Sequence, residues 1–564
     1  MSSRLRIQLA AADREVGAAA TAEARSGRWA ERLFAREASL WTDDLAIQRD
    51  IAGRLGWLEA PEHFTLQIAA LEGFGDAIRE TGFSTAVVMG MGGSSLAPLV
   101  LHRIFGTAPG YLDLRVLDST DPAAVAATVD DLDPLQTLWI VASKSGTTTE
   151  PLAFLADARA RVAAALEAAD ADQRPGEFVA AITDPGRSLE SIPHHDDMRE
   201  RFLNPPDVGG RYSALTYVGL VPASLIGLDL DALLAAASAT LGQCREPDPD
   251  ANPGVGLGVA LGALARAGRD KLTFVSEPEL APFGAWAEQL LAESTGKGGV
   301  GIVPVDQEPP RVAEAYADDR VFVELALAGG RSGDREGRLR DLVAAGQPVI
   351  RIELDDPIDI GGEFVRWEVA TAIAGAVLGI NPFDQPNVEE AKDRTRRLLA
   401  GDDRPGAATD GQPPLRVADL DEDRLAAALG PSLAGLRPPG YVAVQAFIAP
   451  SPAADAAIAG LRSALAATGC ATTAGYGPQF LHSTGQLHKG GPAGGTFFQL
   501  TSDHPVDRPI PGWPYTFGRL IDAQARGDRE ALRAHDRSVI HVHLGVDLEA
   551  DLRTLERAVA RAVT

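Results

Sequence analysis

The chain has 564 residues, of which 45% are hydrophobic and 23% charged, and a length of this order suits two or three globular domains. Its formal net charge of −26 argues against nucleic acids and anionic membranes as partners. The sequence contains no run of about 18 uncharged apolar residues and no signal-peptide core, so we expect a cytoplasmic protein. Its two cysteines, Cys244 and Cys470, have neither the number nor the spacing of a disulfide framework or a metal site.

Hydrophobic periodicity divides the chain into five regions. Residues 1–61 carry helical patterns and predict an N-terminal helical region. Strand-like and helical runs alternate over residues 62–230 and again over residues 231–400, which is typical of doubly wound parallel sheets. Residues 401–438 are rich in Pro, Gly and Asp and predict a linker with a short helix. Residues 439–564 predict a C-terminal α/β block.

The most informative stretch is Leu138–Leu152, where a buried apolar strand leads into a polar loop and then a helix. Hydroxyl groups and backbone N–H groups of such a loop, together with the helix N-terminus, can bind a phosphate. The strand Ala86–Met89 ends in a second loop of small, hydroxyl-bearing residues, and neighbouring parallel strands would bring the two loops to one crevice. The expected phosphate contacts are Ser94, Ser143, Lys144, Ser145, Thr147 and Thr148. Taken alone, the first loop could equally be a helix cap without a ligand.

Lysine is rare in this chain, since only five of the 52 basic residues are lysine. Lys144, Lys297, Lys392 and Lys489 lie inside polar motifs, whereas Lys271 stands just before a predicted strand. A lysine ammonium is a point charge for phosphate and an acid of adjustable pKa. Its retention in these motifs therefore indicates local positive charge for an anionic substrate.

Three further segments carry candidate chemistry. Gly209 and Gly210 bring the backbone close to a neighbour and present Arg211, which could also be an ordinary salt-bridge partner. Glu293 ends a predicted helix beside a glycine-rich loop and is a candidate general base, with a surface charge as the alternative. Residues 479–492 contain two histidines and a lysine, but the ligand spacing of a zinc site is missing.

Quoted together, five motifs resemble those of the glucose-6-phosphate isomerase family, and they follow its order. They are GMGGSSLAP from Gly90, ASKSGTTTEP from Ala142, VGGRYSAL from Val208, AESTGKGG from Ala292 and NPFDQPNVEEAK from Asn381. The resemblance implies two sugar isomerase domains, each a doubly wound parallel sheet with flanking helices. It also implies an aldose–ketose isomerase that interconverts glucose 6-phosphate and fructose 6-phosphate without a metal or an organic cofactor.

The same resemblance implies roles for individual residues. Glu293 would carry a proton between two sugar carbons, Arg211 would stabilise the enediolate, and Lys392 would assist ring opening together with a histidine. That histidine is most simply His482, although His488 stays open as the alternative, and the family supplies it from the partner subunit of a homodimer. The further implied substrate contacts are Gly93, Gly210, Gln289, Gln385 and His488.

The histidine segment departs from the family order. The family generally carries it between the glutamate and lysine motifs, whereas here it follows both motifs and the linker. The C-terminal block is therefore expected to be a relocated piece of the family's chain or an additional domain. Alternative functions are a phosphoglucose/phosphomannose isomerase and a non-catalytic sugar-phosphate-binding regulator. Fusion to a transaldolase is disfavoured, because no residues remain for a barrel of about 250 residues.

Overall fold

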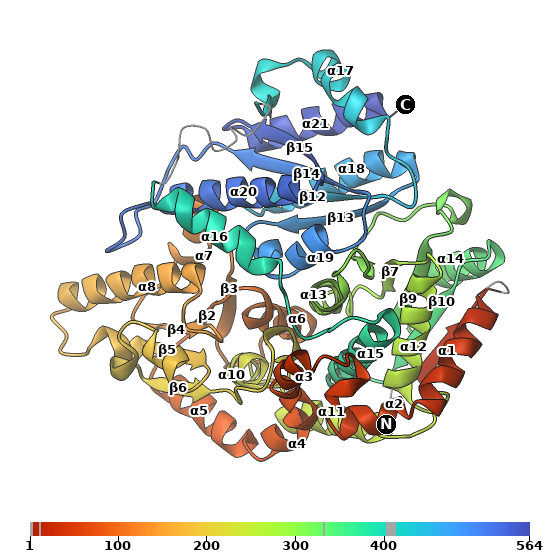
Figure 1. Ribbon diagram of the computed structural model, residues 1–564. Helices are drawn as coiled ribbons and strands as arrows, with labels where there is room; N and C mark the ends of the chain where they lie inside the picture. The colour runs from red at the N-terminus through yellow and green to blue at the C-terminus, as the bar shows by residue number, and fades with distance from the viewer. Residues whose placement is uncertain (1–3, 11–12, 331–332, 402–412, 564) are drawn as a thin grey trace.

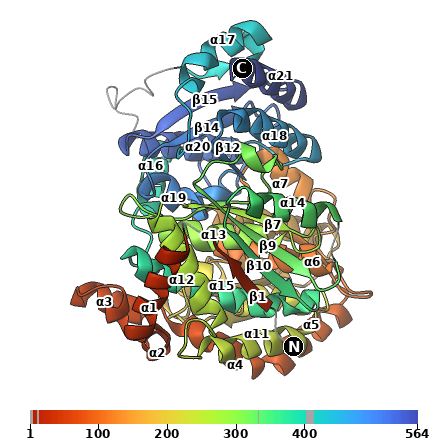
Figure 2. The ribbon, with the colours of Figure 1, turned by 90° about the vertical axis from the view of Figure 1, so that its right-hand side faces the viewer.

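The computed structural model describes residues 4–10, 13–330, 333–401 and 413–563, and it contains three five-stranded sheets with helices on their faces (Figure 1). This confirms the predicted α/β class with parallel sheets. Two sheets lie side by side in the lower part of the molecule, and the third lies above them in both views (Figures 1 and 2). Within the described ranges, no helix has the length and apolar character to cross a membrane.

The first sheet has the order β3-β2-β4-β5-β6 and is parallel throughout. Its strands are β2 (Thr85–Met89), β3 (Asp113–Leu117), β4 (Thr137–Ala142), β5 (Val179–Thr183) and β6 (Glu200–Leu203). The central strands β2, β4 and β5 are buried along their whole length, as expected for apolar runs covered on both faces. The helices of this part of the chain are α5 (Ile68–Glu80), α6 (Leu96–Phe105), α7 (Pro122–Val129), α8 (Thr149–Ala168), α9 (Arg187–Glu190) and α10 (Tyr217–Leu225). Since β2 and β4 are neighbours, their carboxyl ends open at the same edge of the sheet.

The second sheet has the order β1-β10-β9-β7-β8. Its strands are β1 (Arg4–Gln8), β7 (Lys271–Ser276), β8 (Val303–Val305), β9 (Arg320–Leu327) and β10 (Val349–Leu354). Within residues 1–61, predicted as an N-terminal helical region, the chain also forms the unpredicted strand β1, which pairs antiparallel with β10. Five residues are too few to show a period, and the partner strand lies far along the chain. The nearby helices are α11 (Leu230–Cys244), α12 (Pro253–Arg266), α13 (Phe283–Thr295), α14 (Gly333–Ala344) and α15 (Ile360–Leu378). The next helix, α16 (Val388–Leu399), packs instead against α20 (Phe517–Ala534) of the C-terminal block (Figure 1).

Of the N-terminal helices, α2 (Trp29–Phe34), α3 (Leu45–Ala52) and α4 (Ala60–Thr65) lie along the bottom of the molecule in Figure 1, and α1 (Arg14–Ser26) packs beside α12. The buried rings of Trp57 and Tyr212 stack with centroids 5.1 Å apart, which ties this region to the segment that carries Arg211. The predicted helices of residues 1–61 therefore support the first two sheets from outside.

The C-terminal sheet has the order β11-β15-β14-β12-β13 and is parallel. Its strands are β11 (Leu415–Arg416), β12 (Tyr441–Phe447), β13 (Ala471–Tyr476), β14 (Gly495–Ser502) and β15 (Ser538–Leu544). The predicted linker over 401–438 is too long, because β11 pairs with β15 and α17 (Glu422–Leu433) packs on α21 (Leu548–Ala562). Residues 402–412 of that prediction lie outside the described ranges. The remaining helices are α18 (Pro452–Leu465), α19 (Gly485–Gly490) and α20 (Phe517–Ala534).

The C-terminal block is anchored on the regions of both lower sheets. The segment after β14 reaches α7 and α8, where Arg508 forms ion pairs with Asp130 (2.9 Å) and Asp157 (3.3 Å). Phe517, at the start of α20, is fully buried in the core of the first two sheets. On the other side, α19 packs against α13. This docking brings the segment between β13 and α19, which contains His482, down between the two lower sheets.

Candidate active site

The polar loop after β4 forms a compact set of hydroxyl groups. Ser143 Oγ donates to Thr148 Oγ1 over 3.0 Å, and the Oγ atoms of Ser145 and Thr147 lie 2.9 Å apart. Gly146 has φ +66°, and a Cβ atom there would lie 1.8 Å from the carbonyl oxygen of Ser188, so this turn requires glycine. Helix α8 begins directly behind these hydroxyls. The arrangement offers an anion short O–H donors and the positive end of a helix.

Lys144 extends away from these hydroxyls and toward the next strand. Its Nζ atom forms an ion pair with Asp184, at the end of β5, and donates to the carbonyl oxygen of Pro206 (3.0 Å). Burial raises the pKa of the Asp184 carboxyl group, and its bond to Lys144 opposes this rise. The ammonium thus lies beside the loop but already has a carboxylate partner.

The loop after β2 comes into close contact with two other segments. Gly92 has φ +52°, and a Cβ atom on it would lie 2.3 Å from the carbonyl oxygen of His482. A Cβ atom on Gly93 would lie 2.2 Å from the carbonyl oxygen of Gly210. Ser94 belongs to the same turn. The two glycines therefore let the loop after β2 meet the segments that carry Arg211 and His482.

Arg211 is 3% exposed, and its whole guanidinium group is engaged. It donates to Ser294 Oγ (2.8 Å), Gln385 Oε1 (3.1 Å) and the carbonyl oxygens of Pro382 (2.8 Å) and Asp384 (2.9 Å). Its Nη1 atom also lies 3.3 Å from Glu293 Oε1. A planar cation is thus fixed beside the candidate base, where it can stabilise developing negative charge.

Helix α13 places Gln289 and Glu293 one turn apart on the same face. The Gln289 amide donates to Glu293 Oε2 (3.2 Å) and to the carbonyl oxygen of His482 (2.7 Å). Glu293 is 9% exposed. Its position is consistent with the prediction that this helix presents a carboxylate to a site. The alternative of a surface charge does not fit a side chain that is buried to this extent. Glu293, Gln289 and Arg211 thus form one connected cluster.

Lys297 follows one turn later and secures the loop that Arg211 also contacts. Its Nζ atom donates to the carbonyl oxygen of Asn381 (2.6 Å) and to Asp384 Oδ1 (2.6 Å). Burial and the neighbouring charge of Arg211 lower the pKa of this ammonium to about 7. Two cations therefore hold the turn that presents Gln385.

His482 reaches the cluster from the C-terminal block. Its Nε2 atom lies 3.1 Å from Oε1 of Glu150, a buried residue in the first turn of α8. Burial acts to raise the pKa of Glu150, but the charges of His482 and Lys392 outweigh it and hold this pKa below its ordinary value. Lys392, on α16, is therefore close enough to influence the carboxylate. The helix that begins at the phosphate loop thus also supplies the partner of the histidine.

His488 is not part of this cluster. It is 4% exposed, its ring packs against Phe480 and Phe497, and its Nδ1 atom lies 3.1 Å from Gln445 Nε2. Burial and the nearby Lys489 charge lower the pKa of this imidazole well below its ordinary value. Its position is that of a core residue of the C-terminal block, which leaves His482 as the histidine of the site.

The resemblance implied a histidine from a partner subunit, but within this chain His482 already lies at the cluster. His482 contacts Gln289 and Glu150 of its own chain, because the relocated block folds back between the two lower sheets. Sequence reasoning also missed two residues that link these segments. Gln486 bonds to the backbone of Gly296 (2.9 Å) and Asn387 (2.9 Å), and Gln524 bonds to Glu150. No local pattern marks either glutamine, since both have partners far away in the sequence.

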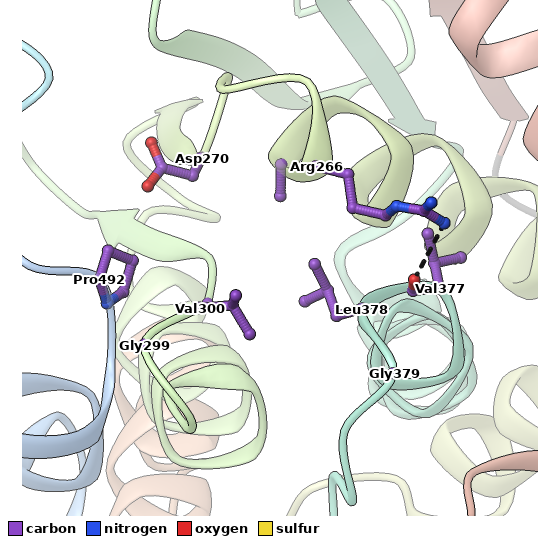
Figure 3. A pocket seen from close by; sticks show the side chains of 10 residues that line it. Arg266, Asp270, Gly299, Val300, Val377, Leu378, Gly379 and Pro492 are labelled. Atoms are coloured by element: carbon purple, nitrogen blue, oxygen red, sulfur yellow. Dashed lines mark hydrogen bonds between the residues drawn. The ribbon is translucent and has the colours of Figure 1, made fainter.

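A cavity of about 530 Å³ lies between the glycine loop after α13 and the end of α15 (Figure 3). Its walls include the glycine loop at Gly299 and Val300, the end of α15 at Gly379, and the charged residues Arg266 and Asp270. The residues that line it include none of the predicted site residues. Across the described ranges, no group of three or more His, Cys, Asp or Glu side chains is arranged to hold a metal ion.

Comparisons with known proteins find similar sequences and folds. The phosphoglucose isomerase family model matches residues 61–301. A glucose-6-phosphate isomerase of Rubrobacter xylanophilus is 32% identical over 389 residues, which cover 60% of this chain and 87% of the relative. A crystal structure of a hypothetical protein of Thermus thermophilus matches with a TM-score of 0.59 and 25% identity, over 70% of this chain and 100% of that one. The structure of a glucose-6-phosphate isomerase from Chlamydia trachomatis matches with a TM-score of 0.51 and 22% identity, over 61% and 75% of the two chains.

These matches and the α/β fold define a phosphosugar isomerase. More narrowly, the chain belongs to the glucose-6-phosphate isomerase family.

Proposed function

We propose that the protein interconverts glucose 6-phosphate and fructose 6-phosphate. The observation that carries this proposal is a single cluster, in which Arg211 pairs with Glu293 and the Gln289 amide donates both to Glu293 and to the backbone carbonyl oxygen of His482. A base, a cation for an enediolate and a histidine for ring opening are the groups that an aldose–ketose isomerisation requires. The adjoining phosphate loops would select a phosphorylated sugar.

The substrate phosphate would bind to the hydroxyls and N–H groups at the carboxyl ends of β2 and β4, from Ser94, Ser143, Ser145, Thr147 and Thr148, with Lys144 nearby. Gly93 and Gly210 would allow the close approach of the backbone there. His482 would move a proton between the ring oxygen and the anomeric hydroxyl, and Lys392 would assist from α16. The open-chain aldehyde is the product of this step.

Glu293 would then remove the proton from C2 of the open-chain aldose. The electron pair of that C–H bond forms a C1–C2 double bond, and the C1 carbonyl becomes the enediolate oxygen that Arg211 stabilises. The proton of the C2 hydroxyl passes to O1, and return of the abstracted proton to C1 then leaves a carbonyl at C2 and gives the ketose. The carbonyl itself acidifies the adjacent C–H bond, so a positioned carboxylate suffices as the base. Gln289 and Gln385 would orient the base and the arginine, respectively.

The test is conversion of glucose 6-phosphate to fructose 6-phosphate by the purified protein in the presence of a chelator. Glu293→Gln should lower kcat by about 10³-fold, within the range that a general base supplies. Glu288→Gln is the matched control, because Glu288 lies on the same helix but next to Asp306. We expect that variant to stay within about twofold of the wild type, since a residue outside the reacting cluster has no part in proton transfer.

The alternatives give different results in the same assay. Binding of the sugar phosphate without turnover would identify a non-catalytic regulator. Comparable turnover of mannose 6-phosphate would identify a phosphoglucose/phosphomannose isomerase. A Glu293→Gln variant whose kcat equals that of the wild type would contradict the assignment of Glu293 as the base.

A further inference from the structure

A second polar chain reaches the histidine–carboxylate pair from the C-terminal block. Gln524, on α20, donates from Nε2 to Glu150 Oε1 over 2.6 Å. Its own Oε1 atom accepts a hydrogen bond from Thr120 Oγ1 over 2.7 Å. Gln524 is 3% exposed, and Thr120, in the loop after β3, is fully buried. Four segments that are distant in the sequence thus meet in the order Thr120, Gln524, Glu150, His482.

An ionised Glu150 carboxylate can only accept hydrogen bonds, so it faces the NH₂ end of the Gln524 amide, and the bond from Thr120 is compatible with this orientation. A carboxylate that accepts bonds from an amide donor and from His482 Nε2 is favoured in its ionised form. The ionised form in turn keeps the proton of neutral His482 on Nε2, so that Nδ1 is the nitrogen able to accept a proton.

We propose that Gln524 is a positioning residue for ring opening, which orients Glu150 and thereby sets the tautomer of His482. This inference rests on the proposed isomerase function and assigns a task to α20 of the C-terminal block. The groups that face the Glu150 carboxylate are His482, Gln524, Lys392 on α16 and Tyr515. Of these four, Gln524 is the one whose amide is held in turn by a further buried side chain, Thr120.

Gln524→Met tests the proposal, because methionine nearly conserves the volume and removes the amide donor. The assay compares fructose 6-phosphate with its 5-O-methyl derivative, which cannot close its ring and needs no ring opening. On fructose 6-phosphate we expect kcat to fall by about 10- to 100-fold, part of the contribution of an acid–base group. On the open-chain derivative the loss should stay within about threefold. The acid limb of kcat/KM should also move to higher pH, because loss of the donor disfavours the ionised carboxylate.

Gln499→Met is the matched control. Gln499 is a fully buried glutamine of β14 that accepts a hydrogen bond from Arg529, so its loss should lower thermal stability without moving the acid limb. Thr120→Val is the milder second variant, and it should move the acid limb in the same direction by a smaller amount. Should Gln524→Met fail to fold, Thr120→Val decides the question.

Equal losses on both substrates, or an unmoved acid limb in both Gln524→Met and Thr120→Val, would overturn the positioning role. If the wild type does not turn over the open-chain derivative, the shift of the acid limb of kcat/KM in the two variants decides whether Gln524 has this role. A wild type that turns over neither substrate would overturn the proposed isomerase function, and this inference with it. The two failures are therefore distinguishable.

Discussion

The predicted phosphate loop, Ser143–Thr148, and the segment that contains His482 are built in opposite ways. The hydroxyls of the loop bond to one another within Ser143–Thr148, directly between β4 and α8. His482 instead meets Glu150 across 332 residues of sequence and Gln289 across 193. The loop is a local structure, whereas the histidine is positioned by tertiary docking. A local structure can be recognised from a short motif, whereas the distant partners of a docked residue cannot.

The docked part depends on several anchors that lie outside the reacting cluster. Arg508 and Phe517 attach the C-terminal block to the first sheet region, and Gln486 attaches it to the loops around Gly296 and Asn387. Loss of these contacts would remove His482 while leaving the phosphate loop intact. The comparison therefore predicts that binding and ring opening can be separated by mutation.

The largest expected effect concerns whether one chain contains the whole site. Glu293→Gln and His482→Ala should each reduce turnover of glucose 6-phosphate by at least about 10²-fold, because each removes an acid–base group. A mixture of the two variants should remain as inactive as either alone, since His482 and Glu293 belong to the same cluster of the same chain. The measurement is the activity of the two variants after co-expression.

If the C-terminal blocks were exchanged between two chains, co-expression would restore one intact site in each mixed dimer. Activity would then rise to about a quarter of the wild type for random pairing. Two wild-type chains with different affinity tags, purified in tandem, show whether mixed assemblies form at all. Recovery of activity would show that the histidine comes from a partner chain. The site would then not be contained in one chain.

A smaller effect is expected at the local structure. Ser145→Ala removes one hydroxyl donor from the phosphate loop and should raise KM by about 10-fold with kcat nearly unchanged, as for one hydrogen bond to a charged group. Inhibition by inorganic phosphate should weaken by a similar factor. Ser191→Ala, in which the lost hydroxyl bonds only to the Arg187 carbonyl oxygen, is the matched control. A fall in kcat with unchanged KM would place Ser145 at the reacting carbons and not at the phosphate.

The same contrast explains what could be predicted from the sequence. Strands β2, β4 and β7 were predictable, because each is a buried apolar run that ends in turn residues. Strands β1 and β11 were missed, because they are short and depend on distant partners. For such strands the pairing itself, and no local pattern, is the stabilising feature.

The site follows the same rule. The two histidines stand six positions apart in similar surroundings, and only packing against Phe480 and Phe497 distinguishes buried His488 from His482. Glu150 lies inside a recognisable motif, but its role follows from a partner that is far away in sequence. Residue types were therefore predictable, whereas their pairing was not.

The junction between the second sheet and the C-terminal block holds a pair of carboxyl groups. Burial and the negative charge of Asp306 raise the pKa of Glu288, on α13, to about 8. Burial likewise raises the pKa of Asp306 to about 6. Arg462, from α18, opposes both shifts and donates to the backbone carbonyl of Asp306 (2.9 Å). The docked block therefore meets the second sheet at groups that titrate near neutral pH.

The smallest expected effect is the pH dependence of stability at this junction. The pKa of folded Glu288 lies above its ordinary value of 4.5, so the folded state binds the proton more tightly, and stability falls as pH rises from about 4.5 to about 8. Glu288→Gln removes this titration, and its melting temperature should exceed that of the wild type by about 2–4 °C at pH 8, with little difference at pH 5. Glu279→Gln serves as the control. Glu279 is exposed, so its replacement should change the melting temperature neither at pH 8 nor at pH 5. A gain that is equal at both pH values would mean that Glu288 is ionised throughout. The C-terminal block would then pack against a carboxylate that stays charged, comparable to Asp184, which pairs with Lys144 beside the loop after β4.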